Sequence, residues 1–131
     1  MTFELAMLAA SCVLGFGHIV LASQAASLER GYRWTAGPRD DAQPALTGIS
    51  GRLSRASANF TETFPFFVAA VVLAQLVGVH DWRTFWGSGL YFGARLAYLP
   101  LYAAGVFLVR SLAWNVAAVG IAMLIWAAVA P

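Results

Sequence analysis

The segment RASANFTETFP, residues 55–65, decides how the rest of the sequence is interpreted, because it places polar groups at the start of an apolar run that ends at Val79. Arg55, Asn59 and Glu62 are spaced i, i+4 and i+7, so on a helix they lie along one face. Ionisable groups are costly inside a membrane-length segment, and a functional site is one interpretation of them. A structural ion pair that fixes helix packing is the other, and residue chemistry alone favours the two about equally.

The composition excludes an ordinary soluble domain. Of 131 residues, 60% are hydrophobic and only 11% are charged, which indicates a protein that contacts a lipid bilayer. There is no basic run of the kind that binds nucleic acid, and the single cysteine, Cys12, excludes an intrachain disulfide. Glu4 and the lack of a basic N-terminal region predict that the first apolar segment is a retained helix rather than a cleaved signal peptide.

Four apolar segments predict an all-α fold, an integral membrane four-helix bundle that forms one domain over residues 1–131. Each segment is close to the roughly 20 residues that a helix needs to cross a bilayer. The expected helices span about residues 3–26, 53–79, 84–109 and 111–130, with Arg110-Ser111 as the turn between the last two.

The third segment carries a second polar stripe, because Arg95, Tyr98 and Tyr102 are spaced i, i+3 and i+7. An arginine near the middle of a membrane helix costs roughly 2.5 to 3.5 kcal/mol on insertion scales, so Arg95 should have a partner. Glu62 is the one acid inside the apolar spans apart from Glu4, and we expect it to pair with Arg95. No metal site is expected, since no cluster of Cys or His has metal-ligand spacing.

The arginines predict the orientation of the chain. Four crossings put both termini on one side of the membrane, with Arg83 as the one arginine there. The opposite side carries Arg30, Arg33, Arg39, Arg52, Arg55 and Arg110. The positive-inside rule then places the connection at residues 27–55 in the cytoplasm and both termini outside.

Taken together, these motifs resemble the MAPEG family, the membrane-associated proteins of eicosanoid and glutathione metabolism. The matching residues are Arg55-Ala-x-x-Asn59-x-x-Glu62-x-x-Pro65, then Ala94-Arg95-x-x-Tyr98-x-x-x-Tyr102, then Arg110. The loop around Gly37-Pro38-Arg39-Asp40 is more similar to the small bacterial branch of that family than to the eukaryotic enzymes. This resemblance implies a multi-pass protein of a bacterial inner membrane, with periplasmic termini.

The resemblance also implies a homotrimer that binds glutathione, as co-substrate, between neighbouring subunits. Arg55, Asn59 and Glu62 match residues that hold the peptide part of glutathione. The partner helix that completes this site is matched by Arg95, Tyr98 and Tyr102. Arg110 matches an arginine that acts on the thiol, with Tyr102 as a second candidate for that role. Ala58 departs from the pattern, because some glutathione-binding members have a base there.

The residue chemistry is consistent with a tripeptide thiol. Arginines match its carboxylates, Glu62 can pair with its ammonium group, and a nearby guanidinium favours the thiolate. The implied function is a glutathione transferase or peroxidase that acts on lipophilic electrophiles from the bilayer. The thiol could also be another small thiol. A binding or scaffold protein that retains the fold is the alternative, and a small transporter ranks last because no pair of broken helices is visible.

Overall fold

The computed structural model describes residues 1–106 and 108–131, and within them every regular element is a helix. Four helices are long and one is short. They are α1 (Phe3–Arg30), α2 (Tyr32–Ala36), α3 (Gly48–Val77), α4 (Trp82–Ala103) and α5 (Val109–Val129). By length and apolar composition, α1, α3 and α5 could each cross a membrane. Helix α4 has 22 residues and is long enough, but it carries two arginines, and its apolar residues are interrupted by glycines and polar groups.

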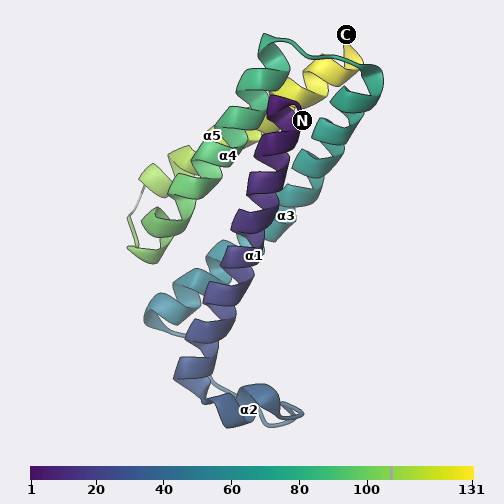
Figure 1. The fold of residues 1–131 in the computed structure, drawn as a ribbon. Coiled ribbons are helices and arrows are strands. Elements are labelled where there is room, and N and C mark those ends of the chain that lie inside the picture. Colours follow the sequence, from purple (N-terminus) through teal and green to yellow (C-terminus); the bar gives the residue numbers. More distant parts are fainter. Residues whose placement is uncertain (107) are drawn as a thin grey trace.

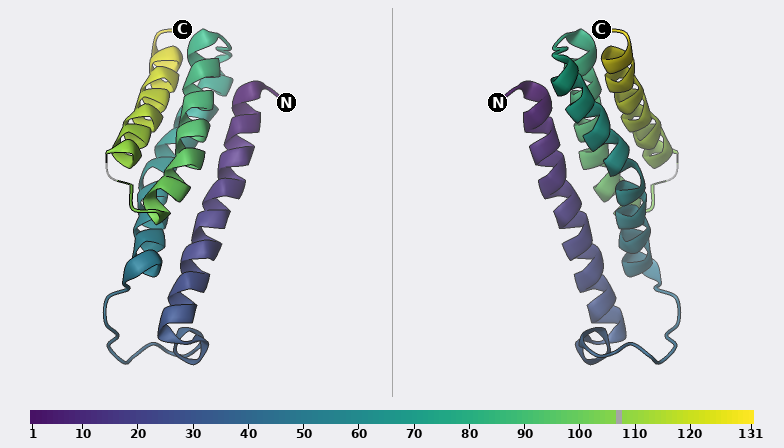
Figure 2. Two further views of the ribbon diagram at one scale, coloured as in Figure 1. Left: turned by 90° about the vertical axis from the view of Figure 1, so that its left-hand side faces the viewer. Right: turned by 90° about the vertical axis from the view of Figure 1, so that its right-hand side faces the viewer.

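The helices form an elongated bundle whose two termini lie at the same end (Figure 1, Figure 2). Helices α1 and α3 extend beyond the turn between α4 and α5, and α2 lies at the far end with the loop that follows it (Figure 1). The arginine-rich connection lies at the end of the bundle opposite to both termini.

The first two long helices extend further toward this connection than the sequence predicted. Helix α1 continues to Arg30 and ends at Gly31, whose φ of 91° favours glycine. Helix α3 begins at Gly48, after Thr47, whose backbone N–H and hydroxyl both donate to Glu29 Oε1, at 2.9 and 3.0 Å. This contact joins the end of α1 to the start of α3, and it is a long-range interaction that a local pattern does not show.

The predicted boundary between the third and fourth segments is wrong. Helix α4 ends at Ala103 rather than near residue 109, because Gly105, at φ 72°, adopts the left-handed conformation that ends helices. Helix α5 already includes Arg110 and Ser111, which were expected to form the turn. The predicted helix 84–109 also contained Phe107, which lies outside the described residues.

The core lies where α3, α4 and α5 meet. Phe67 of α3 stacks on Tyr91 of α4 with ring centroids 3.9 Å apart, and both side chains are fully buried. Ala117 and Leu124 of α5 complete this cluster. Stacking of these rings adds to the hydrophobic stabilisation, and the packing fixes the three helices that carry the candidate site.

Polar contacts at the end with the termini join α1 to α4. The Thr84 hydroxyl donates to the buried Glu4 carboxylate at 2.6 Å, and His80 Nδ1 lies 3.7 Å from the second oxygen of Glu4. At the start of α4, Arg83 pairs with Asp81 at 2.7 Å. This hydrogen-bonded guanidinium holds the pKa of the Asp81 carboxyl below its ordinary value.

Helices α4 and α5 approach closely at a pair of glycines. A Cβ added to Gly120 would lie 2.5 Å from the carbonyl oxygen of Gly87 and 2.9 Å from the amide nitrogen of Tyr91. Because both neighbours are backbone atoms, they cannot move aside without separating the helices. Small residues at such crossings let membrane helices pack tightly.

We therefore expect Gly120→Ala to lower the free energy of unfolding by about 1–3 kcal/mol, the usual cost of overpacking. Gly93→Ala in α4 is the matched control, because a Cβ there meets nothing within 4 Å. Alanine should be neutral at that position or should stabilise the helix slightly. Unfolding of the two variants in detergent, followed by circular dichroism, measures the difference. Equal stabilities would show that the glycine contact is not close.

Candidate functional site

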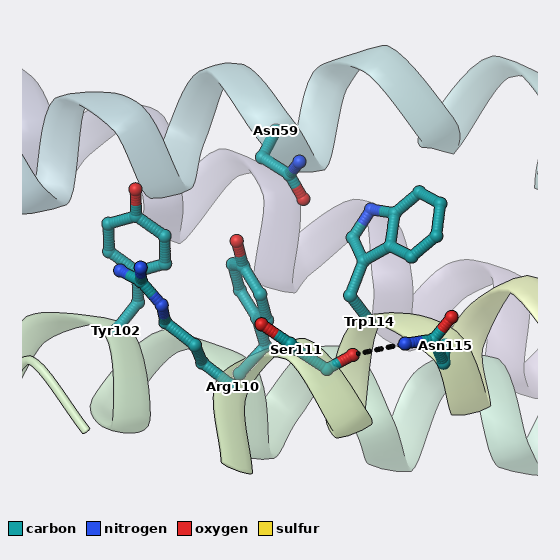
Figure 3. Close-up of a pocket in the computed structure, with 7 residues that line it drawn as sticks. Asn59, Tyr102, Arg110, Ser111, Trp114 and Asn115 are labelled. Atoms are coloured by element: carbon teal, nitrogen blue, oxygen red, sulfur yellow. Dashed lines mark hydrogen bonds between the residues drawn. The ribbon is translucent and has the colours of Figure 1, made fainter. Parts of the chain in front are cut away.

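A pocket of about 330 Å³ opens between α3, α4 and α5 (Figure 3). Helix α3 contributes one lining residue, α4 contributes two tyrosines and α5 contributes four residues. The lining residues are Asn59, Tyr98, Tyr102, Arg110, Ser111, Trp114 and Asn115. Four of the residues singled out in the sequence, Asn59, Tyr98, Tyr102 and Arg110, are thus brought together from three separate helices.

Arg110 and the two tyrosines form one wall of the pocket. Tyr98 and Tyr102 are one helical turn apart on α4, and their ring centroids lie 5.3 Å apart. The guanidinium carbon of Arg110 lies 4.8 Å from the centroid of the Tyr102 ring, which is a cation–π contact (Figure 3). This contact directs the Arg110 side chain along the pocket rather than away from it, and the guanidinium keeps donors for an anionic ligand.

Asn59 forms the opposite wall and is held by a buried arginine. Arg95 Nη1 donates to Asn59 Oδ1 at 2.8 Å, and Arg95 Nη2 donates to the hydroxyl of Thr63. Asn59 and Thr63 are one turn apart on α3, so a single guanidinium fork reaches both. The bond fixes the Asn59 amide, whose oxygen accepts from Arg95 and whose Nδ2 group is a donor.

The expected pair between Glu62 and Arg95 is wrong. Arg95 is 1% exposed and uses its Nη atoms on Asn59 and Thr63, whereas Glu62 is exposed. The ion pairs found in residues 1–106 and 108–131 are His80–Glu4 and Arg83–Asp81, both at the end of the bundle that carries the termini. Aromatic rings surround the Arg95 guanidinium instead, with the Tyr98 centroid 5.3 Å away.

The remaining predicted site residues lie outside the pocket. Arg55 and Glu62 are exposed on α3 and do not line it, and Arg95 lies beneath it. Arg110 is therefore the one charged side chain among the lining residues. In the described part of the chain, no three His, Cys, Asp or Glu side chains could share a metal ion.

Three lining residues were missed by the sequence analysis: Ser111, Trp114 and Asn115. With Arg110 they occupy positions i, i+1, i+4 and i+5, which lie on one side of a helix. The sequence shows this spacing, but the predicted helix begins at residue 111 and leaves Arg110 in the turn, which separates Arg110 from these residues. Asn115 Nδ2 donates to the backbone oxygen of Ser111 at 2.8 Å, which fixes the amide at the pocket edge (Figure 3).

Arg52 is a further missed residue, and it positions the helix that carries the two tyrosines. Its Nε donates at 2.8 Å to the carbonyl oxygen of Ala103, the last residue of α4. An arginine at this place hydrogen-bonds to the last carbonyl of the helix and complements the negative end of the helix dipole. Arg52 thus fixes the end of α4 against α3, close to the turn that leads to Arg110.

Comparison with known protein families identifies a match over nearly the whole chain. The model of the MAPEG family matches residues 7–130. No curated protein matches the chain.

Proposed function

We propose that this chain, which belongs to the MAPEG family, is a membrane transferase or peroxidase that uses glutathione against lipophilic electrophiles. The observation that supports the proposal most directly is the pocket in which Arg110, on the ring of Tyr102, faces an asparagine held by a buried arginine. Family membership supports glutathione-related chemistry at a coarse level, and the pocket supplies groups suited to it.

Each wall of the pocket has a distinct role in this proposal. The guanidinium of Arg110 stabilises the thiolate of glutathione, which is the reactive species. Tyr102 is the second candidate donor to the sulfur, and Asn59 hydrogen-bonds to the peptide part. In conjugation, the thiolate sulfur forms a bond to the electrophilic carbon and the leaving group departs with its electron pair. The protein contributes mainly orientation and electrostatic stabilisation.

A single protomer supplies only part of such a site. Glutathione carries two carboxylates and one ammonium group, whereas Arg110 is the one charged residue that lines the pocket. Arg55 and Glu62 have the complementary charges and are exposed on α3. We therefore propose that a neighbouring copy of the chain brings further charged groups to the ligand, in the homotrimer that the family resemblance implies. Native mass spectrometry in detergent tests the stoichiometry of three.

The second substrate enters from the bilayer in this proposal. Trp114 at the pocket and Leu112 beside it are exposed apolar side chains, with exposed fractions of 38% and 64%. We propose that helix α4 also crosses the membrane, beside α1, α3 and α5. Its Arg95 is buried inside the bundle, so the charge would not contact lipid. The arginine-rich end lies in the cytoplasm, the termini lie in the periplasm, and the pocket opens toward cytoplasmic thiol.

A binding isotherm for glutathione on the detergent-purified protein, followed by a conjugation assay with a generic aryl halide, tests the function. We expect saturable binding, an ultraviolet signal from bound thiolate, and turnover. Binding without turnover would reject the transferase and favour a non-catalytic binding protein with this fold. If glutathione does not bind, the same titration with other small thiols tests whether the site takes a different one.

A further inference from the structure

A second pocket, of about 520 Å³, lies at the opposite end of the bundle from the termini, between the end of α1, α2 and the following loop. Its lining includes three arginines, two aspartates and one tryptophan. These six residues are Arg30, Arg33, Trp34, Arg39, Asp40 and Asp41. None of them lines the candidate active site, whose lining residues come from α3, α4 and α5.

Two of the arginines are held in place around the tryptophan. The guanidinium carbons of Arg30 and Arg39 lie 5.1 and 6.0 Å from the Trp34 ring centroid. Arg30 also donates to the backbone oxygen of Pro44 at 3.1 Å, and Arg39 Nε donates to that of Thr35 at 2.9 Å. These contacts use only some of the donors of each guanidinium, so the fork of each side chain is fixed with donors still available.

No arginine of this cluster forms an ion pair with either aspartate of the pocket. The ion pairs within the described residues are His80–Glu4 and Arg83–Asp81, both at the other end of the bundle. Two further donors at the cluster, Arg30 Nε and Trp34 Nε1, are shielded from solvent without a hydrogen-bond partner. Uncompensated donors of this kind favour an anion, and planar guanidiniums match phosphate oxygens in particular.

The aspartates suggest which phosphate compound fits. Asp40 and Asp41 are exposed on the same pocket and can pair with a cation, while they disfavour a ligand that is only anionic. A headgroup that joins a phosphodiester to a primary ammonium group satisfies both sets of charges. Leu28, Tyr32 and Ile49, all more than half exposed near this end of α1 and α3, provide apolar contacts for the attached lipid chains.

We propose that this pocket binds the headgroup of an aminophospholipid, with the arginines on the phosphodiester and the aspartates on the ammonium. Arg30 is the last residue of a helix that can span the membrane, which places the pocket at headgroup depth. The bound lipid would anchor α2 and the following loop to the membrane surface.

Native mass spectrometry of the detergent-purified full chain, titrated with lipids of matched acyl chains, tests the proposal. Phosphatidylethanolamine should bind more tightly than phosphatidylglycerol, which lacks the ammonium, and than phosphatidylcholine, whose ammonium cannot donate. Arg33→Gln should weaken binding of all three by about fivefold, the effect of one interfacial arginine. Arg83→Gln, at the other end of the bundle, is the control and should leave binding unchanged.

The double variant Asp40→Asn, Asp41→Asn distinguishes recognition of the ammonium group by the aspartates from general attraction of anionic lipids to the arginines. It should weaken phosphatidylethanolamine binding about fivefold and strengthen phosphatidylglycerol binding, so that the preference reverses. Equal affinity for the three lipids, or no effect of the double variant, would overturn the proposal. Glycerophosphoethanolamine and inorganic phosphate serve as soluble competitors. If either bound as tightly as the lipid, the site would belong to a soluble phosphate compound and the lipid assignment would be wrong.

Discussion

Replacing Arg110 by serine should lower the turnover of glutathione conjugation by about 100-fold, the usual effect of removing one donor that stabilises a developing or resident anion. Arg110 is the one charged residue that lines the pocket, and its guanidinium is already oriented by the ring of Tyr102, 4.8 Å away. Without it, none of the described residues that line the pocket carries a positive charge.

Glutathione binding should largely survive this substitution, because the carboxylate and peptide contacts are made elsewhere. The ultraviolet absorbance of the thiolate should therefore appear when glutathione is titrated into the wild-type protein and be absent from Arg110→Ser at the same saturation. The pH at which the thiolate forms on the variant should rise toward that of free glutathione. Stopped-flow absorbance and steady-state turnover measure the two effects independently.

The competing interpretation is that Arg110 only anchors the start of α5 among the lipid headgroups. Arg110→Lys distinguishes the two, since a point charge serves an anchor but lacks the planar fork that stacks on Tyr102. An anchor predicts full turnover with lysine and unchanged thiolate signal with serine. That result would move the activation of the thiol to Tyr102, for which Tyr102→Phe is then the test.

The existence of the long helices could be predicted from the sequence, but their ends could not. Length and apolar composition are local properties, and they located the four long helices. The end of α4 depended on Gly105, which lies inside a continuous apolar run from residue 103 to 109. A glycine can end a helix, but the hydrophobic residues on both sides of Gly105 favour a continuous helix, so the sequence predicts one that runs past this glycine.

The partner of Arg95 shows why a site is harder to predict than a fold. The sequence predicts a pair between Arg95 and Glu62, because opposite charges attract. Successive residues of a helix lie about 100° apart around its axis. Thr63 therefore lies on one side of Asn59, and Glu62 lies on the opposite side of Asn59. Asn59 and Thr63, which are neutral acceptors at i and i+4, therefore hydrogen-bond to Arg95. Their spacing is visible in the sequence, but a prediction based on opposite charges does not use it.

Replacing Arg95 by alanine should lower the free energy of unfolding by about 3 kcal/mol. Two opposing effects decide whether the substitution lowers or raises the free energy of unfolding. Removal of a buried charge relieves its desolvation, which favours the variant. Against this, the variant loses two charged hydrogen bonds, leaves Asn59 and Thr63 without their donor, and opens a cavity among three aromatic rings. Two such bonds alone are worth about 3 kcal/mol or more, so we expect destabilisation.

The control is Glu62→Gln, which separates the observed contacts from the ion pair that the sequence suggested. Glu62 is exposed in the protomer and forms no ion pair with Arg95 in the described residues, so its substitution should change stability by no more than about 0.5 kcal/mol. Denaturant unfolding of both variants in one detergent measures the difference. Equal destabilisation by the two substitutions would restore the ion pair and contradict the geometry described above.

A milder substitution tests whether Arg95 also positions Asn59 for the ligand. Lysine keeps the charge but cannot donate to Asn59 and Thr63 together, because it lacks the guanidinium fork. Arg95→Lys should therefore raise the KM for glutathione about tenfold, as expected for a misplaced hydrogen-bonding group, while kcat changes little because Arg110 and Tyr102 are untouched. A change in kcat with unaltered KM would assign Arg95 a role in the reaction itself, and unchanged values of both would limit Arg95 to the stability of the bundle.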